Sequence, residues 1–107
     1  MALIDLTDSG FERDVLRSEL PVLVEFWAPG CGPCREMAPV LEDVARRYEE
    51  RLVVGKLNVD DFMETPGRFG VVEIPTMLFF REGKVTGVQV GAVSAAAFEE
   101  WLEGLFL

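Results

Sequence analysis

The feature that most restricts the fold is the run Val22–Ala28, which is apolar on both of its alternating faces apart from Glu25. Strands of this kind are covered on both sides and belong to sheets enclosed between helices. A loop with two cysteines follows. The next segment has apolar residues at helical spacing, namely Met37, Val40, Leu41, Val44, Ala45 and Tyr48. The run therefore predicts a buried strand that continues through a short loop into a long helix.

The same alternation of patterns extends along the rest of the chain. Further strands are expected at Ile4–Leu6, Leu52–Val59, Met77–Arg81 and Lys84–Val90. Because only Glu82 and Gly83 separate the last two strands, these strands are expected to form a hairpin. The order of the patterns predicts an α/β protein with parallel strands first and an antiparallel pair last.

Three further helices are predicted from their capping residues. Thr7 and Asp8 precede the first, Thr65 and then Pro66 begin a short one, and Ser94 caps the last. With 107 residues, the chain is expected to form one domain over residues 1–107.

The formal net charge of −9 excludes several classes of function. An acidic protein repels phosphate backbones and anionic lipid surfaces, and the chain has no basic stripe that would offset this repulsion. No apolar run is long enough to span a bilayer, and Met1–Asp5 lacks the features of a signal peptide. We therefore expect a cytoplasmic protein that binds neither nucleic acid nor membrane.

The chain has two cysteines and no histidine. The lack of histidine excludes Ser-His-Asp and Cys-His catalysis. Two thiolates supply only half of the usual zinc ligands, so a metal would need carboxylate ligands or a second molecule. We expect neither a metal nor another cofactor.

Cys31 and Cys34 are separated by Gly32 and Pro33 at the expected start of the long helix. Disulfide exchange needs an attacking thiolate and a second thiol that resolves the mixed disulfide. Free N–H groups and the helix dipole stabilise a thiolate there and lower its pKa below the usual value of about 8.5. Pro33 suits the first helical turn, and Gly32 lets a partner's backbone approach. Half of a metal site and two packed apolar residues are the alternatives, but the position after a buried strand favours redox chemistry.

Four segments, in order, resemble the thioredoxin family. They are Val24–Ala28 with Cys31–Cys34, then Lys56–Asp60, Ile74–Thr76 and Val90–Ala92. The resemblance covers nearly the whole chain. It implies the thioredoxin fold, a central mixed five-stranded sheet flanked by four helices, and a monomer that reduces disulfide-containing proteins. It also implies recycling by a thioredoxin reductase with electrons from NADPH.

The resemblance assigns roles to individual residues. Cys31 is the exposed attacking thiol, Cys34 is the buried resolving thiol, and Pro75 is cis and lies against the disulfide. Only about 5% of X-Pro bonds in folded proteins are cis, so this expectation depends on the family and not on the dipeptide. The residues expected to contact substrate are Trp27, Gly30, Gly32, Pro33, Ile74, Pro75 and Gly91. Trp27 would shield the dithiol, and a core aromatic is the alternative.

The chain departs from the family at three positions. Glu25 replaces the usual Asp, Gly30 replaces the usual Trp, and Glu73 replaces a residue that is small in many members. The loss of an aromatic at Gly30 and the charge of Glu73 suggest narrower docking. A partner-specialised relative and a non-catalytic binding module with this fold are therefore the alternative functions.

Glu25 and Lys56 are the expected auxiliary groups. A carboxyl in a buried strand has a raised pKa, and Glu25 is expected to accept the Cys34 proton through a water. The alternatives are a solvated strand end or a structural pair with Lys56. Lys56 either holds its ammonium near Glu25 and tunes that carboxyl or is an exposed strand-end lysine.

Overall fold

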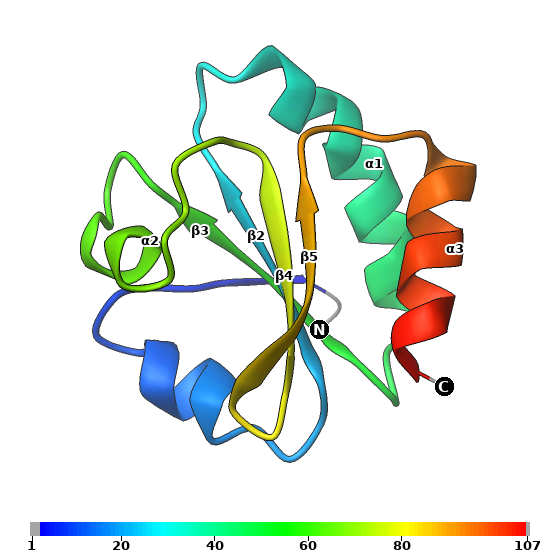
Figure 1. Ribbon diagram of the computed structural model, residues 1–107, viewed down its shortest axis with the longest axis horizontal. Coiled ribbons are helices and arrows are strands. Elements are labelled where there is room, and N and C mark those ends of the chain that lie inside the picture. Colours follow the sequence, from blue (N-terminus) through cyan, green and yellow to red (C-terminus); the bar gives the residue numbers. More distant parts are fainter. Residues whose placement is uncertain (1–2, 107) are drawn as a thin grey trace.

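The computed structural model describes residues 3–106, which form a mixed five-stranded sheet (Figure 1). The strands are β1 (Leu3–Asp5), β2 (Val22–Trp27), β3 (Val53–Asn58), β4 (Thr76–Arg81) and β5 (Lys84–Val90). Their order across the sheet is β1-β3-β2-β4-β5. β1, β3 and β2 are parallel, β4 is antiparallel to β2, and β5 is antiparallel to β4. The predicted mixed sheet is confirmed.

Helices cover both faces of this sheet. They are the π-helix η1 (Glu12–Leu16) and the α-helices α1 (Gly32–Arg47), α2 (Glu64–Arg68) and α3 (Ala95–Phe106). Figure 1 shows α1 and α3 on one side of the sheet and α2 with the blue η1 on the other. The helices at both faces explain why β2 is apolar on both of its sides.

Two apolar clusters fill the space between the helices and the sheet. Leu23 of β2 packs with buried residues of α1 and α3, while Val24 and Phe26 of the same strand pack with those of η1. Successive side chains of a strand point to opposite faces, so Glu25 shares the face of Leu23. The fold therefore directs the one charged side chain of β2 toward α1.

Of the capping residues predicted for the first helix, Thr7 accepts a hydrogen bond from Gly10 N–H at 3.0 Å in the turn that leads into it, although Phe11 is the N-cap of η1 and has no side-chain cap of its own. The predicted capping by Asp8 and by Thr65 is wrong. Asp8 does not cap the helix that follows it. Its carboxylate accepts hydrogen bonds from the N–H groups of Glu64 and Thr65, at 3.2 and 2.9 Å, and from the Thr65 hydroxyl at 2.6 Å. Asp8 thus caps α2 across a long stretch of sequence, and α2 begins at Glu64, with Met63 rather than Thr65 at its N-cap. The first helix is a π-helix, in which Arg17 N–H bonds to the Glu12 carbonyl at 2.9 Å.

Other local predictions agree closely with the structure. Ser94 Oγ accepts a hydrogen bond from Ala97 N–H at 3.1 Å and caps α3. Glu82 and Gly83 have φ values of 54° and 79°, which are typical of a two-residue hairpin turn. The peptide bond between Ile74 and Pro75 is cis, as expected. Strand boundaries differ by about one residue, so that β1 begins at Leu3 instead of at Ile4.

Candidate active site

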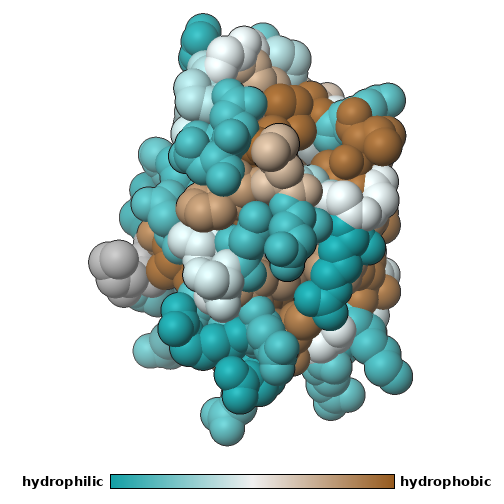
Figure 2. All heavy atoms as spheres, turned by 90° about the vertical axis from the view of Figure 1, so that its left-hand side faces the viewer, coloured by the Kyte–Doolittle hydropathy of each residue, from teal (hydrophilic) through white to brown (hydrophobic). Residues whose placement is uncertain are grey.

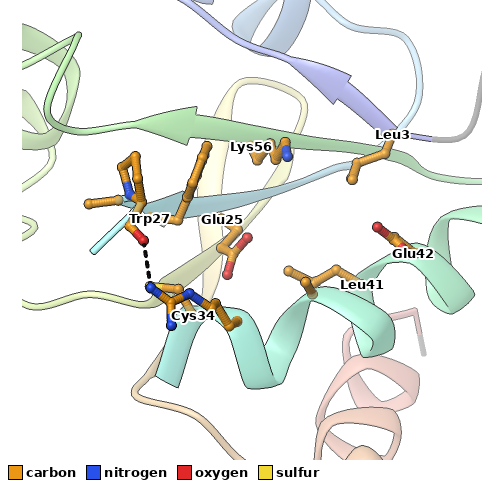
Figure 3. A pocket seen from close by; sticks show the side chains of 11 residues that line it. Leu3, Glu25, Trp27, Cys34, Leu41, Glu42 and Lys56 are labelled. Carbon is orange, nitrogen blue, oxygen red and sulfur yellow. Dashed lines mark hydrogen bonds between the residues drawn. The ribbon is translucent and has the colours of Figure 1, made fainter. Parts of the chain in front are cut away.

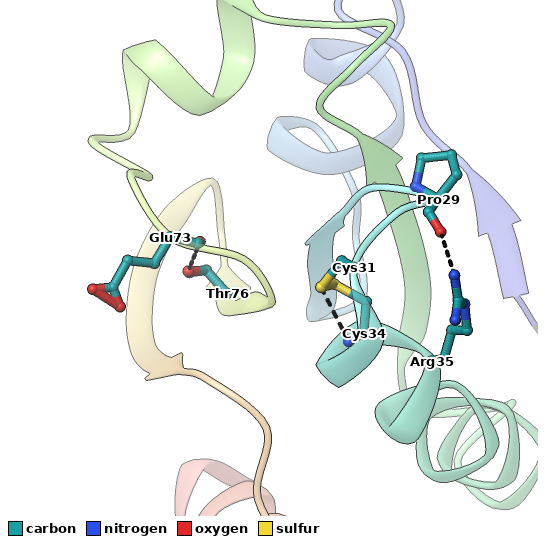
Figure 4. Close-up of a disulfide and its surroundings, with 6 residues drawn as sticks. All are labelled: Pro29, Cys31, Cys34, Arg35, Glu73 and Thr76. Carbon is teal, nitrogen blue, oxygen red and sulfur yellow. Dashed lines mark hydrogen bonds between the residues drawn. A yellow bond between two sulfur atoms is a disulfide. The ribbon is translucent and has the colours of Figure 1, made fainter.

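Cys31 and Cys34 lie where the loop after β2 enters α1, and a disulfide joins them (Figure 4). Cys31 is the N-cap of the helix, and its Sγ accepts a hydrogen bond from Cys34 N–H at 3.1 Å. Pro33 stands in the first turn, where its missing N–H costs no helical hydrogen bond. The Cys31 sulfur therefore occupies the position of a capping acceptor, where a negative charge is stabilised.

The two cysteines differ in their accessibility to solvent. Cys34 is 5% exposed and belongs to the buried face of α1, whereas Cys31 is partly exposed at the helix entrance. A disulfide of another molecule therefore reaches Cys31 first. Gly30 and Gly32, which flank Cys31, have open space where a Cβ atom would stand.

Two further segments meet the cysteine loop at this end of the sheet. Phe26 pairs with Thr76 in the antiparallel register of β2 and β4, so the turn containing Ile74 and Pro75 lies beside the end of β2. The N–H of Gly91 donates to the Pro75 carbonyl at 2.8 Å. The residue has a φ of 88°, which favours glycine. The sheet thus brings together three of the sequence segments predicted to form the site.

A cavity of about 110 Å³ connects the buried side of the disulfide with Glu25 (Figure 3). Cys34, Trp27 and Lys56 also line it. Figure 3 shows the Glu25 carboxylate pointing from β2 toward α1. Because a buried water needs only about 10–15 Å³ of such space and a few polar partners, the cavity has room for water between Glu25 and Cys34.

Glu25 is 4% exposed, and its Oε2 has no hydrogen-bond partner among the described residues. Burial disfavours the charged form and raises the pKa of Glu25 to about 7, although the positive charge of Lys56 acts in the opposite direction. The carboxyl therefore changes its protonation state near neutral pH.

Lys56 lies opposite Glu25 in the register of β2 and β3. Within residues 3–106 it forms no ion pair with Glu25, and its Nζ lies 4.8 Å from the centroid of the Trp27 ring. Trp27 is half-buried, and its buried Nε1–H has no acceptor in the described part of the chain. The ammonium is thus held near the cavity by a cation–π contact, and it acts on Glu25 through its field.

Several residues of α1 that line the same cavity are not marked as site residues by any motif in the sequence. Arg35 Nη2 donates to the Pro29 carbonyl at 3.3 Å, and Ala38, Leu41 and Glu42 complete this wall. Ala38 and Glu42 follow Cys34 at spacings of four and eight residues, which place all three on one helix face. This spacing was the available signal.

The comparisons with known proteins agree with this geometry. A family model described as Thioredoxin matches residues 2–104. A thioredoxin of Pseudomonas aeruginosa is 46% identical over 101 residues, which make up 94% of this chain and 94% of that protein. A thioredoxin of Acidithiobacillus ferridurans is 45% identical over 102 residues, 95% of this chain and 94% of that protein. Thioredoxin 1 of a Nostoc species is 42% identical over 102 residues, 95% of each chain.

Two further observations concern the part of the chain that the structure describes. None of its helices is both long enough and apolar enough to cross a membrane. No group of three or more potential metal-ligating side chains comes together in residues 3–106.

Proposed function

This chain belongs to the thioredoxin family and carries out dithiol–disulfide exchange, and from that premise we propose that Cys31 attacks the target disulfide and Cys34 resolves the product. The observation that carries this assignment is the position of Cys31 Sγ at the helix N-cap, accepting the Cys34 N–H, with Cys34 itself buried. The exposed sulfur is therefore the stabilised anion, and the buried one lies directly behind it.

The first step forms a mixed disulfide. The Cys31 thiolate attacks one sulfur of the target disulfide, a bond forms between the two sulfurs, and the other target sulfur leaves as a thiolate that takes a proton from solvent. Gly30 and Gly32 leave the approach to Cys31 open. We assign docking of the target backbone to Trp27, Pro33, Ile74, Pro75 and Gly91, which belong to the segments that meet at this end of the sheet.

The second step releases the reduced target. Cys34 loses its proton and attacks Cys31 Sγ; the mixed disulfide breaks, and the second target sulfur leaves and is protonated. Two electrons have then passed from the two cysteines to the target, and both target thiolates have taken their protons from solvent. We assign proton acceptance from Cys34 to Glu25, through water in the shared cavity, because a carboxyl with a pKa of about 7 is well matched to this task. Lys56 is a positioning residue that tunes Glu25.

The proposal includes the setting in which the protein works. Repeated turnover requires that the Cys31–Cys34 disulfide is reduced again, and we assign this to a thioredoxin reductase that uses NADPH. A reducing protein of this kind fits the cytoplasm, where thiols are kept reduced. The net charge of −9 favours a monomer, because like-charged copies repel each other.

Reduction of insulin tests the proposal. With dithiothreitol as electron donor, the wild-type protein should accelerate insulin precipitation, and Cys31→Ser should lose this activity. Cys34→Ser should instead accumulate a mixed disulfide through Cys31, detected as a mass increase that dithiothreitol reverses. If Cys31→Ser retained the rate, the assignment of the attacking sulfur would be wrong. Oxidation of NADPH in the presence of a bacterial thioredoxin reductase tests the recycling step.

A further inference from the structure

A groove of about 320 Å³ runs between residues 69–73 and the edge strand β5, beside the turn that precedes β4. It is distinct from the cavity that holds Glu25. We name it the valine groove after its apolar lining, which includes Val71, Val72, Leu78, Val85, Val88 and Val90. Figure 2 shows hydrophobic atoms exposed among hydrophilic ones on the side of the molecule that carries α2.

A bulge in β5 creates the floor of the valine groove. Phe79 pairs with Gly87, but Phe80 pairs with Val85, so Thr86 is an extra residue in the ladder. Val85 and Val88 are three positions apart and would face opposite sides of a regular strand. The bulge puts Val85 on the same face as Val88 and Val90, since all three pair with residues of β4 that share one face. They are 39%, 54% and 48% exposed.

Glu73 supplies the one charge in the lining of the groove. Its side chain is exposed and turns away from the Cys31–Cys34 pair (Figure 4), and it forms no ion pair with any described residue. Its backbone is held in place, because the Thr76 hydroxyl donates to the Glu73 carbonyl at 2.6 Å. An exposed negative charge thus stands at one wall of an apolar groove, on a backbone that is held in place.

The valine groove adjoins the active site. Thr76 and Val90, which belong to its lining, are neighbours in sequence of Pro75 and Gly91 and pair with each other across β4 and β5. The groove is therefore within reach of a target segment that passes Pro75 and Gly91. β5 is also an edge strand of the sheet within residues 3–106, so no further strand pairs with its outer side, an arrangement that favours an extended partner.

We propose that the valine groove binds an extended segment of the target protein next to its disulfide, with apolar side chains on Val85, Val88 and Val90 and a Lys or Arg beside Glu73. This proposal rests on the proposed function, since it gives that function a substrate preference. Charge complementarity selects the occupant: a second copy of the chain would bring a further net charge of −9 and a second Glu73 toward the first.

Two peptide substrates test the proposal. Each carries one intramolecular disulfide and a flanking segment, Val-Lys-Val in one and Val-Glu-Val in the other. The pre-reduced wild-type protein should reduce the Lys peptide faster at low salt. Glu73→Gln should decrease the ratio of the two rates about two- to fivefold, which is the usual effect of losing one exposed charge pair. Val88→Ser should slow both peptides about threefold, because burial of a partly exposed valine is lost.

Matched variants and a small substrate complete the experiment. Glu19→Gln and Leu20→Ser are at exposed positions that precede β2, at the end of the strand opposite to Cys31, and should leave both rates unchanged. Bis(2-hydroxyethyl) disulfide has no flanking segment, so the proteins that carry Glu73→Gln or Val88→Ser should reduce it at the wild-type rate. A version of the Lys peptide in which serines replace its cysteines cannot react. The amide NMR shifts that it induces in the protein should centre on Val71, Val85 and Val88.

The possible failures are distinguishable. The groove proposal is overturned if the wild type reduces the two peptides at equal rates or if Val88→Ser has no effect. The proposed function still stands in that case if the protein reduces the small disulfide. A protein that reduces no disulfide overturns both. Concentration-dependent dimerisation that Val88→Ser abolishes shows a second copy in the groove and overturns the choice of a target segment.

Discussion

Two glutamates lie against helix α1 in contrasting surroundings. Glu25 lies near the disulfide, is buried, and has an oxygen for which residues 3–106 offer no hydrogen-bond partner. Glu99 of α3 lies near the other end of α1, where it accepts hydrogen bonds from the Tyr48 hydroxyl at 2.8 Å and from Arg47 Nη1 at 3.1 Å and also pairs with Arg47 Nη2. The pKa of Glu25 is raised by burial, whereas that of Glu99 is lowered, chiefly by the hydrogen bond from Arg47.

The difference shows how one residue type serves two purposes in a small protein. The carboxylate of Glu99 has its hydrogen-bond partners, and these bonds join α3 to the end of α1. In the same region, Tyr48 stacks on Phe106 with ring centroids 5.5 Å apart. The carboxyl of Glu25 is left short of partners beside a cavity, so its proton is exchangeable near neutral pH. Satisfied polar groups contribute to stability, whereas the unsatisfied carboxyl costs stability and is suited to the proton transfer that we propose for it.

The largest expected effect is on stability. Below pH 4.5, Glu25 is protonated in both the folded and the unfolded chain and contributes nothing. As the pH rises toward 7, the unfolded chain ionises first, so the free energy of unfolding falls, and above 7 the loss is complete. The two pKa values correspond to a cost of about 3 kcal/mol. Glu25→Gln should therefore be more stable than wild type at pH 8 and gain little at pH 4.

Urea unfolding of the oxidised protein at both pH values measures this effect. Glu50→Gln, which removes an exposed charge elsewhere, is the matched control and should show no such pH-dependent gain. An equal stability change for Glu25→Gln at pH 4 and pH 8 would refute the raised pKa.

The second effect is on the rate. If Glu25 accepts the Cys34 proton, Glu25→Gln should slow resolution of the mixed disulfide by about tenfold or more at pH 7, as expected for loss of general-base catalysis. The formation of the mixed disulfide should change less. Stopped-flow tryptophan fluorescence with a peptide disulfide separates the two steps, and the pH dependence near 7 should disappear in the variant. An unchanged pH profile would leave Glu25 with a structural role only.

The third effect has the opposite dependence on pH. Glu99 has a lowered pKa, so its stabilising contribution is present above the ordinary value of 4.5 and is lost as the pH falls through the folded pKa. Glu99→Gln should lower the free energy of unfolding by about 1 kcal/mol at pH 7, because a partly exposed charge pair is lost. The variant keeps an oxygen that can accept the hydrogen bond from the Tyr48 hydroxyl. Urea unfolding at pH 7 and pH 3 should show this loss shrinking in acid. Reduction of a small disulfide should be unaffected.

The smallest effect concerns Lys56. Its positive charge lowers the pKa of Glu25 against the larger effect of burial, so Lys56→Met should move the Glu25 midpoint upward from about 7. Carboxyl ¹³C NMR titration measures the shift, and Lys84→Met at the exposed start of β5 is the control. A midpoint unchanged by Lys56→Met would mean that the lysine acts only on the Trp27 ring.

Much of this architecture follows from local patterns. The run around Glu25 predicted a strand covered on both faces, and the spacing from Met37 to Tyr48 predicted the long helix. The residue types at Ser94 and Glu82–Gly83 specified a cap and a turn through bonds to near neighbours. The segments at Cys31–Cys34, Ile74–Pro75 and Gly91 were assigned to one site through their resemblance to a family, because nothing in their local patterns connects them.

The remaining features arise from contacts between distant parts of the chain. Asp8 caps α2 instead of its own helix, Lys56 lies over Trp27 without pairing with Glu25, and the bulge at Thr86 aligns three valines. Periodicity and capping preferences are local and can be interpreted along the chain. A buried carboxyl that finds no hydrogen-bond donor among the described residues, and the cavity that gives it access to Cys34, arise only when the helices close over the sheet and exclude water.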